Sequence, residues 1–270
     1  MHTLAEVTAA LERIAPSRLA AEWDSVGLLV GTRRDRIERV MTCLTLTPDV
    51  AREAVREAAD LVVTHHPLPF RPVARVTDDS PTGRVLLELI GAGIGVWSSH
   101  TAWDSAAGGI NDQLAALLGL DRVTPIEPDP LTPLAGFGRV GHPPADWTLD
   151  RLRRHLQSPA IASTLGIGGV QVAGDPDRPA RRVGVVCGSG GDAVAALKKA
   201  GCDTLVTGEV RLHGGLDCLA HGIAVVAIGH HASERFAMDA LARRIGEALP
   251  GLRTFSSRDD RDPLPFAAPN

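Results

Sequence analysis

The chain contains 270 residues, of which 44% are hydrophobic and 22% charged, and its formal net charge is −4. This is the composition of a globular protein with room for one large or two modest domains. Acidic and basic residues are interspersed, which excludes the basic patch of a protein that binds nucleic acid or an anionic membrane surface. No apolar segment approaches the roughly 18 residues of a membrane span. We therefore expect a soluble protein with neither a nucleic-acid nor a membrane partner.

The cysteines and the first residues indicate the compartment. Four cysteines are scattered without a CxxC pair, which argues against a zinc ribbon or a disulfide framework and fits a reducing environment. Cys43 and Cys187 lie inside apolar runs and are expected to be small buried hydrophobic residues. Charged residues such as Glu6 and Glu12 interrupt the first segment, so it does not resemble a signal peptide. We expect a cytoplasmic location.

The first half of the chain alternates between helical and extended patterns. Thr3 and Glu6 form a capping box before a helix whose apolar face runs to Ile14. After the glycine-punctuated stretch 23–31, we expect strands near 39–46, 60–64 and 95–99, and helices after Thr47-Pro48, near 83–91 and through Leu118. This alternation is typical of βα units with parallel strands.

The second half repeats this rhythm after the segment Thr124–Pro133, which contains four prolines and is interpreted as a linker or crossing loop. Beyond it we expect strands near 134–141, 168–174, 182–187, 204–209 and 222–229, and helices near 148–156, 192–200 and 233–249. We predict an α/β protein with two interlinked lobes and mixed, largely parallel sheets. Residues 1–125 form the first lobe, 126–255 the second, and 256–270 a charged, proline-rich tail expected to be partly disordered.

Three histidine clusters are the most informative feature of the chain, because each one follows an expected strand. They are His65-His66, His100 with Asp104, and His230 with Glu234. Strand ends are where α/β proteins build their sites, and histidine and carboxylate are ligands of divalent transition metals. The clusters therefore predict a metal site.

His65 and His66 are adjacent, and neighbouring residues of a strand point to opposite faces. While the chain stays extended, the two imidazoles do not readily share one ion and suit two neighbouring ions better. Pro67 holds His66 in an extended or turn conformation. The alternative is a pair of hydrogen-bonded structural histidines at the end of a strand.

His230 and Glu234 lie four positions apart at an expected strand-to-helix junction, where the first helical turn brings both side chains to one face. A carboxylate can bridge two ions and a neutral imidazole cannot, so Glu234 is the natural bridging ligand. The alternative is an exposed helical pair. His231 points elsewhere and is not expected to be a ligand.

His100 and Asp104 share the same spacing, but an extended chain would separate them by roughly 13 Å. Both can be ligands only if the chain turns after His100. Asp104 is the better candidate for a ligand, while His100 is assigned to proton transfer or to supporting a ligand, with direct ligation left open. Glu209 is a second candidate for proton transfer, together with His213, although a structural or surface role fits both equally well.

The five ligands predicted from these patterns are three imidazoles and two carboxylates. They can hold two ions with positions left open for water, and mixed nitrogen and oxygen ligation suits Zn, Fe or Mn without selecting among them. The glycine-rich run Gly188–Gly191 before a helix fits either an anion cradle or a tight turn. The predicted metal ligands are His65, His66, Asp104, His230 and Glu234.

Five motifs in order resemble one family over nearly the whole chain, from about Leu4 to Phe255. They are Trp23-Asp24-Ser25-Val26-Gly27-Leu28, Thr64-His65-His66-Pro67-Leu68, His100-Thr101-Ala102-Trp103-Asp104 with Gly109-Ile110-Asn111-Asp112, Thr207-Gly208-Glu209, and Gly229-His230-His231-Ala232-Ser233-Glu234. The chain resembles the Nif-three-like dinuclear-metal hexameric proteins, often called GTP cyclohydrolase 1 type 2 homologues.

The resemblance implies a dinuclear site in the cleft between two α/β lobes, and a toroidal homohexamer whose sites face an internal cavity. It implies that His66, Asp104 and Glu234 hold one divalent ion and that His65, His230 and Glu234 hold the other. A local departure is Ala102-Trp103, where many members have Asn-Leu, which places a bulky aromatic residue near the site.

The resemblance supplies a metal site and leaves the reaction open. Our leading hypothesis is a metal-dependent hydrolase of a nucleotide such as GTP or of another phosphoester, in which activated water attacks a carbon or phosphorus centre. For a cyclohydrolase that centre would be C8 of the purine, and His100 or Glu209 would move protons. The rival hypothesis is a non-catalytic metal carrier, insertase or regulatory scaffold, which needs the same ligands.

Overall fold

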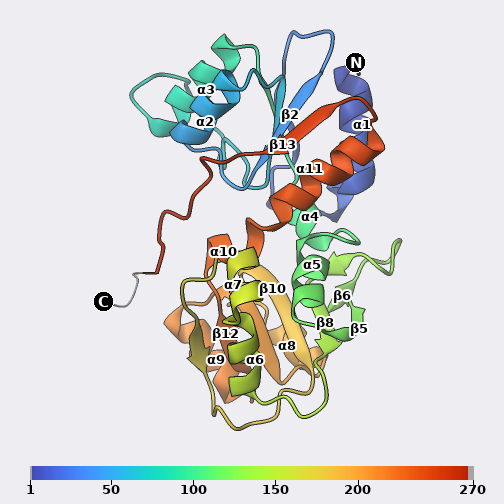
Figure 1. Ribbon diagram of the computed structural model, residues 1–270, viewed down its shortest axis with the longest axis vertical. Coiled ribbons are helices and arrows are strands. Elements are labelled where there is room, and N and C mark those ends of the chain that lie inside the picture. Colours follow the sequence, from blue (N-terminus) through green and yellow to red (C-terminus); the bar gives the residue numbers. More distant parts are fainter. Residues whose placement is uncertain (1, 267–270) are drawn as a thin grey trace. The chain divides into compact units, whose positions relative to one another are not determined.

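The computed structural model describes residues 2–266, and the chain packs as two compact units (Figure 1). Unit 1 comprises the described residues up to Trp103 together with Ala237–Arg261, and unit 2 comprises Asp104–Phe236 and the described residues from Asp262. The predicted lobe boundary at residue 125 differs from this division. Residues 104–125 belong to unit 2 because helix α5 (Ile110–Leu117) packs against two strands of its sheet, β8 (Arg139–His142) and β10 (Val183–Ser189).

Unit 1 contains a five-stranded sheet with the order β1-β4-β3-β2-β13, in which β1 is antiparallel to β4 and all other neighbours are parallel. The strands are β1 (Gly27–Val30), β2 (Arg39–Cys43), β3 (Leu61–Thr64), β4 (Gly95–Ser98) and β13 (Arg253–Ser256). The helices that cover it are α1 (Leu4–Ile14), α2 (Pro48–Arg56), α3 (Pro81–Gly91) and α11 (Ala237–Ala248). Because both faces are covered, β3 and β4 are buried along their whole length.

Unit 2 contains a six-stranded sheet with the order β5-β8-β10-β11-β12-β9, in which the three central neighbours β10, β11 and β12 are parallel. Its other strands are β5 (Asp121–Thr124), β9 (Gln171–Ala173), β11 (Thr204–Glu209) and β12 (Ala224–Ala227). Apolar residues of α5, α6 (Leu149–Leu156) and α7 (Pro159–Leu165) pack on one face. Apolar residues of α8 (Val194–Lys199) and α9 (Leu212–Ala220) form a second cluster. They pack against strand residues that alternate along the sheet with those of the first cluster.

The predicted fold class is confirmed, since both units are α/β with mixed sheets that have parallel centres. The predicted linker Thr124–Pro133 is partly ordered as a two-stranded ribbon, in which β6 (Glu127–Pro128) pairs with β7 (Gly136–Phe137). The long final helix is divided into α10 (His230–Glu234) and α11. Within the described residues, no helix is both long and apolar enough to cross a bilayer.

The first part of the predicted tail is ordered, and residues 267–270 lie outside the described part of the chain. Strand β13 ends at Ser256, and the following residues turn back onto unit 1, where Ser257 and Asp260 are buried. The carboxylate of Glu53 on α2 accepts hydrogen bonds from the Ser257 hydroxyl and from the amides of Arg258 and Asp259. A charged, proline-rich composition did not predict this order because the buried carboxylate that captures the tail lies far away in the sequence.

We predict that Glu53→Ala lowers the free energy of unfolding by about 3 kcal/mol, because it leaves buried amide and hydroxyl donors without their acceptor. Denaturant unfolding followed by circular dichroism measures the change. Glu57→Ala removes an exposed carboxylate from the end of the same helix and should cost less than about 0.5 kcal/mol. Equal effects of the two substitutions would contradict this role of Glu53.

Candidate metal centre

In unit 1, the candidate residues follow the carboxyl ends of two adjacent parallel strands, β3 and β4. Cys43, Thr64 and Ser98 lie level across β2, β3 and β4, and each strand ends at that level. The parallel ladder continues one step further, because the amide of His65 donates to the Cys43 carbonyl and the amide of His100 donates to the His65 carbonyl. The sheet therefore delivers the histidines to one edge.

The imidazoles of His65, His66 and His100 form a cluster. The ring centroid of His65 is 5.1 Å from that of His66 and 5.2 Å from that of His100, and the His66 and His100 centroids are 5.6 Å apart. One nitrogen of each ring lies within 4.8 Å of the others, close enough for the three to hold an ion. His65 and His66 gather on the same side, unlike neighbours in an extended strand, because β3 ends at Thr64 and the chain bends there.

Protein oxygens fix the orientation of two of these rings. The Nδ1 atom of His66 lies 2.8 Å from the Thr45 hydroxyl, and Nδ1 of His100 lies 2.7 Å from Oδ1 of Asp24. In each ring it is the Nδ1 atom that contacts the protein oxygen. Partners of this kind set the tautomer of metal-binding histidines.

Asp24, in the motif 23–28, joins the candidate site although the sequence did not single it out as a candidate. Its Oδ2 atom accepts hydrogen bonds from the amide and hydroxyl of Thr101, on helix α4 (His100–Ser105). Burial opposes ionisation of the Asp24 carboxyl, but the hydrogen bonds from His100 and Thr101 outweigh it and hold its pKa at about 2. Asp24 is therefore an anionic clamp on the helix that begins at His100.

Helix α4 shows that the chain turns after His100. It starts at His100 and includes Asp104, so the chain is helical between them rather than extended. Trp103 on the same helix is fully buried, with the guanidinium of Arg244 4.9 Å from its ring centre. Trp103, which departs from the pattern of the family that the chain resembles, thus packs into unit 1 against Arg244.

In unit 2, the candidate residues again follow parallel strands. Glu209 is the last residue of β11, and the chain leaves β12 through Ile228 and Gly229 to begin α10 at His230. As expected for the first helical turn, Nε2 of His230 lies 3.2 Å from Oε2 of Glu234. Nδ1 of His230 lies 3.2 Å from Oε1 of Glu209, so Glu209 orients this imidazole as Asp24 orients His100. The hydrogen bond with Glu234 raises the pKa of His230 to about 9, against the opposing effect of burial.

Glu234 is buried, and glycine makes room for it. Gly188 has φ +62°, and a Cβ atom there would collide with Oε1 of Glu234. The amide of Gly188 donates to the Ser233 hydroxyl at 2.9 Å, and the amide of Gly190 donates to the Glu209 carbonyl at 3.2 Å. Since these amides are bonded within the protein, the glycine-rich run behaves as a tight turn that admits the carboxylate, rather than as an anion cradle.

Asp104 belongs to unit 2, and a buried arginine anchors the segment that follows it. The guanidinium of Arg139 donates to both oxygens of Asp112 at 2.6 and 2.8 Å. It also donates to the carbonyl of Ala106 at 3.0 Å and to those of Gly136 and Gly138. No sequence pattern pointed to Arg139. Its bonds tie Asp112 to the carbonyl of Ala106, just after Asp104.

The predicted residues thus form two sets, one in each unit. Unit 1 holds His65, His66 and His100, while unit 2 holds Asp104, Glu209, His230 and Glu234. The first set offers imidazole nitrogens and the second mixes imidazole with carboxylates, which fits divalent transition metals. His213, the partner suggested for Glu209, is exposed on the first turn of α9.

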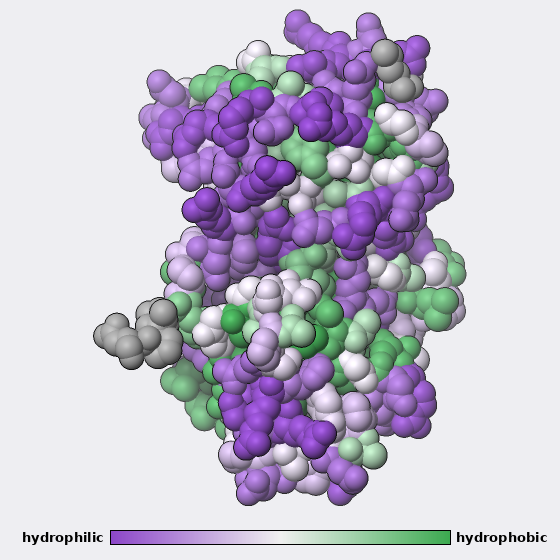
Figure 2. Space-filling view, viewed as in Figure 1, coloured by the Kyte–Doolittle hydropathy of each residue, from purple (hydrophilic) through white to green (hydrophobic). Residues whose placement is uncertain are grey.

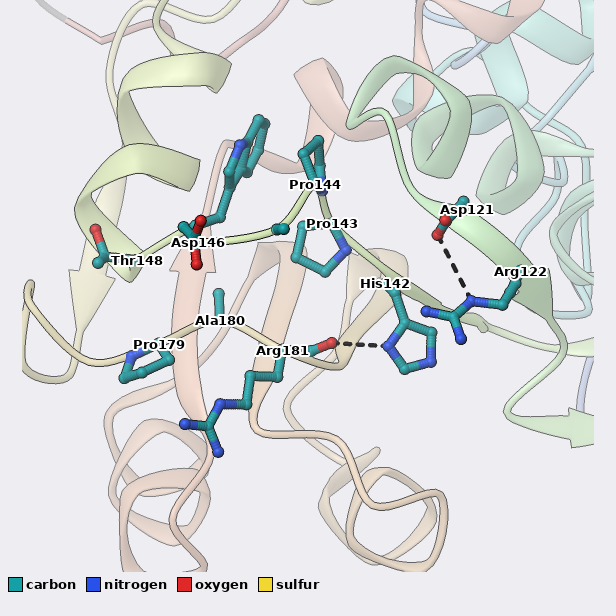
Figure 3. A pocket seen from close by; sticks show the side chains of 12 residues that line it. Asp121, Arg122, His142, Pro143, Pro144, Asp146, Thr148, Pro179, Ala180 and Arg181 are labelled. Carbon is teal, nitrogen blue, oxygen red and sulfur yellow. Dashed lines mark hydrogen bonds and ion pairs between the residues drawn. The ribbon is translucent and has the colours of Figure 1, made fainter.

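A cavity of about 610 Å³ in unit 2 is a different feature (Figure 3). It is lined on one side by Asp121, Arg122 and His142 and on another by Pro179 and Arg181, with Nδ1 of His142 bonded to the Arg181 carbonyl. Among the described residues that line it, none is a predicted ligand or proton-transfer group. This cavity is therefore not the predicted site.

Comparison with known proteins identifies the family. The profile of the Duf34/NIF3 (NGG1p interacting factor 3) family matches residues 2–263, which is nearly the whole chain. The chain belongs to the Duf34/NIF3 family. This confirms the resemblance drawn from the five motifs.

Two relatives and one solved structure illustrate how closely the NIF3 family is matched. A Clostridium perfringens protein named GTP cyclohydrolase 1 type 2 homolog is 34% identical over 257 residues, covering 95% of this chain and 96% of its own. The NIF3-like protein 1 of Drosophila melanogaster is 30% identical over 263 residues, covering 97% of this chain and 88% of its own. The crystal structure of a Bacillus cereus protein related to NIF3 shares the fold, with a TM-score of 0.88 and 21% identity over 97% of this chain and 98% of that one.

We predict that Gly188→Ala in this NIF3-family chain displaces the Glu234 carboxylate and removes at least half of the bound metal. The new methyl group would occupy the position of Oε1, and the left-handed backbone adds about 1–2 kcal/mol of strain. Elemental analysis of the purified protein measures metal per chain. Gly191→Ala is the matched control, since the nearest atom to its added Cβ is 4.0 Å away. Equal metal content in both variants would contradict the prediction.

Proposed function

We propose that this protein holds two divalent metal ions through side chains of both units. In this proposal His66, Asp104 and Glu234 hold one ion, His65, His230 and Glu234 hold the other, and Glu234 bridges them. The observation that carries it is the matched construction of the two sets, since each stands at the carboxyl ends of parallel strands. His66, His100 and His230 each have Nδ1 beside a protein oxygen.

The path of the chain supports bringing the two sets together. The chain passes from unit 1 to unit 2 between Trp103 and Asp104, and returns between Phe236 and Ala237. Asp104 is thus the first residue after one crossing, and Glu234 lies just before the other.

We propose that the site serves a metal-dependent hydrolase acting on a nucleotide-like substrate. Divalent ions in such a site supply Lewis acidity and lower the pKa of water. In this proposal His100, held by Asp24, transfers a proton, and Glu209 serves either as a second proton carrier or as the group that orients His230. The curated name of the Clostridium perfringens relative is consistent with this class of reaction.

Two exposed aromatic side chains favour a substrate with a planar ring. The side chains of Trp23 and Phe70 are 68% and 55% exposed, although the chain has only four tryptophans and five phenylalanines. Their ring centroids lie 5.9 and 6.1 Å from that of His100, each ring roughly perpendicular to it. Apolar ring faces next to a candidate proton-transfer group suit stacking against a purine or pyrimidine base.

Turnover of a panel of nucleotides and phosphoesters by metal-loaded protein tests the proposed activity. We predict hydrolysis of at least one nucleotide, loss of that activity in His66→Ala, and a decrease in kcat of about 100-fold or more in His100→Gln. Liquid chromatography of the products measures the rates. Absence of turnover above the His66→Ala background for every compound would contradict the hydrolase proposal.

One observation favours a second function, that of a metal carrier or insertase. The imidazoles of His65, His66 and His100 gather within unit 1 alone, where they can hold an ion without ligands from unit 2. An ion held this way is suited to transfer. Rapid exchange of bound metal with a chelator, with no dependence on any nucleotide, would favour this function over catalysis.

We propose that copies of the chain associate through an apolar face of unit 2, as the toroidal homohexamer implied by the family requires contacts of this kind. Leu212, Leu216 and Leu219 recur on one side of α9 and are exposed, Leu212 to 74%. A groove of about 320 Å³ beside them reaches the edge strand β9. Figure 2 shows hydrophobic side chains gathered on the surface of this unit.

We predict that Leu216→Glu converts the wild-type oligomer into smaller species, because the charge cannot be buried in an apolar contact. Light scattering during size-exclusion chromatography measures the mass. Leu87→Glu changes an exposed helical leucine of unit 1 and should leave the oligomer intact. A monomeric wild type, or a loss of assembly only in Leu87→Glu, would contradict the assignment.

We propose a cytoplasmic location, and the state of the four cysteines is consistent with it. All four are buried and none forms a disulfide. A reducing compartment keeps cysteines as free thiols.

A further inference from the structure

We propose that the thiol of Cys187 is a positioning residue for the metal ligand Asp104. In this proposal the S–H group donates to Oδ1 of Asp104 and leaves Oδ2 as the ligand atom. The inference rests on the metal site of the proposed function and adds a residue to it. Cys187 was expected to be only a small buried hydrophobic residue.

The contact between the two side chains is direct. Cys187 lies on β10, and its Sγ atom is 3.2 Å from Oδ1 of Asp104. Hydrogen bonds that involve sulfur span longer donor–acceptor distances than those between oxygen atoms. A thiol that faces an ionised carboxylate can only donate. Because the side chain of Cys187 is buried, no solvent competes for this carboxylate oxygen from the direction of the thiol.

Asn111 fixes the backbones from which the two side chains project. Its Oδ1 atom accepts a hydrogen bond of 2.8 Å from the amide of Cys187, and its Nδ2 atom donates one of 3.1 Å to the carbonyl of Asp104. Asn111 is buried, and the next residue, Asp112, is held by Arg139. Cys187, Asn111 and Asp104 therefore close a ring of three hydrogen bonds in which the thiol meets the carboxylate.

A thiol is chemically suited to this role. It is a weak donor, so it can orient a carboxylate while withdrawing little of the electron density that a metal ion needs. A strong donor such as an ammonium or guanidinium group would compete with the ion for the same carboxylate. Two of the other cysteines, Cys202 and Cys218, are also buried but show no such contact with a predicted ligand among the described residues.

Titration with Co²⁺ tests the proposal, because the absorption of bound Co²⁺ reports both affinity and ligand type. Cys187→Ala should weaken the binding of one Co²⁺ ion per chain by about 10-fold. Cys187→Ser keeps a donor and should recover most of the loss, whereas Cys202→Ala should bind as the wild type does. The wild-type spectrum should lack a thiolate-to-metal charge-transfer band, because the thiol is a donor to Asp104 and not a ligand.

Three results would overturn the role of Cys187: unchanged Co²⁺ affinity in Cys187→Ala, failure of serine to recover more than alanine does, or a charge-transfer band that disappears in Cys187→Ser. Failure of the wild type to bind Co²⁺ would instead overturn the metal site itself, which separates the two ideas.

Infrared spectroscopy of the metal-free protein gives a second test that does not depend on folding of the Cys187 variants. The S–H stretching band of Cys187 should shift toward that of a weakly bonded thiol in Asp104→Asn, and an unchanged band would overturn the contact.

Discussion

Parallel strand pairing is the constraint on which the candidate site depends. In a parallel sheet all strands leave at the same edge, so residues that follow different strands become neighbours without any sequence proximity. Unit 1 uses this edge to gather His65, His66 and His100 after β3 and β4, and unit 2 uses it to bring Glu209 and His230 together after β11 and β12. Two small sheets with parallel centres therefore give two groups of ligand-type side chains at positions that the ladders fix.

Orientation of the imidazoles is the second requirement, and the protein meets it in the same way three times. Thr45, Asp24 and Glu209 each place an oxygen beside the Nδ1 atom of one histidine. Glycine at position 188 lets a carboxylate enter the buried space next to His230, and the Gly188 amide donates to the Ser233 hydroxyl. A metal ion would then meet donors whose directions were settled by folding, which lowers the entropic cost of binding.

The sequence predicted what is local and missed what is distant. Apolar runs ended by histidine predicted the strands that precede the histidine clusters, and the spacing of His230 and Glu234 predicted their contact in one helical turn. It could not pair Asp24 with His100, 76 residues away, or Cys187 with Asp104, 83 residues away, because periodicity carries no information about tertiary neighbours. The contacts that order the start of the tail and the division after Trp103 also depend on packing between segments that are remote in the chain, which periodicity does not reveal.

Anomalous X-ray scattering from crystals of the Zn²⁺-loaded protein tests the central claim most directly. The account predicts two ions per chain, about 3.5–4 Å apart, with Glu234 touching both, His65 and His66 on different ions, and Asp104 and His230 completing the set. A single ion held by His65, His66 and His100 within unit 1, or ions remote from these residues, would contradict it.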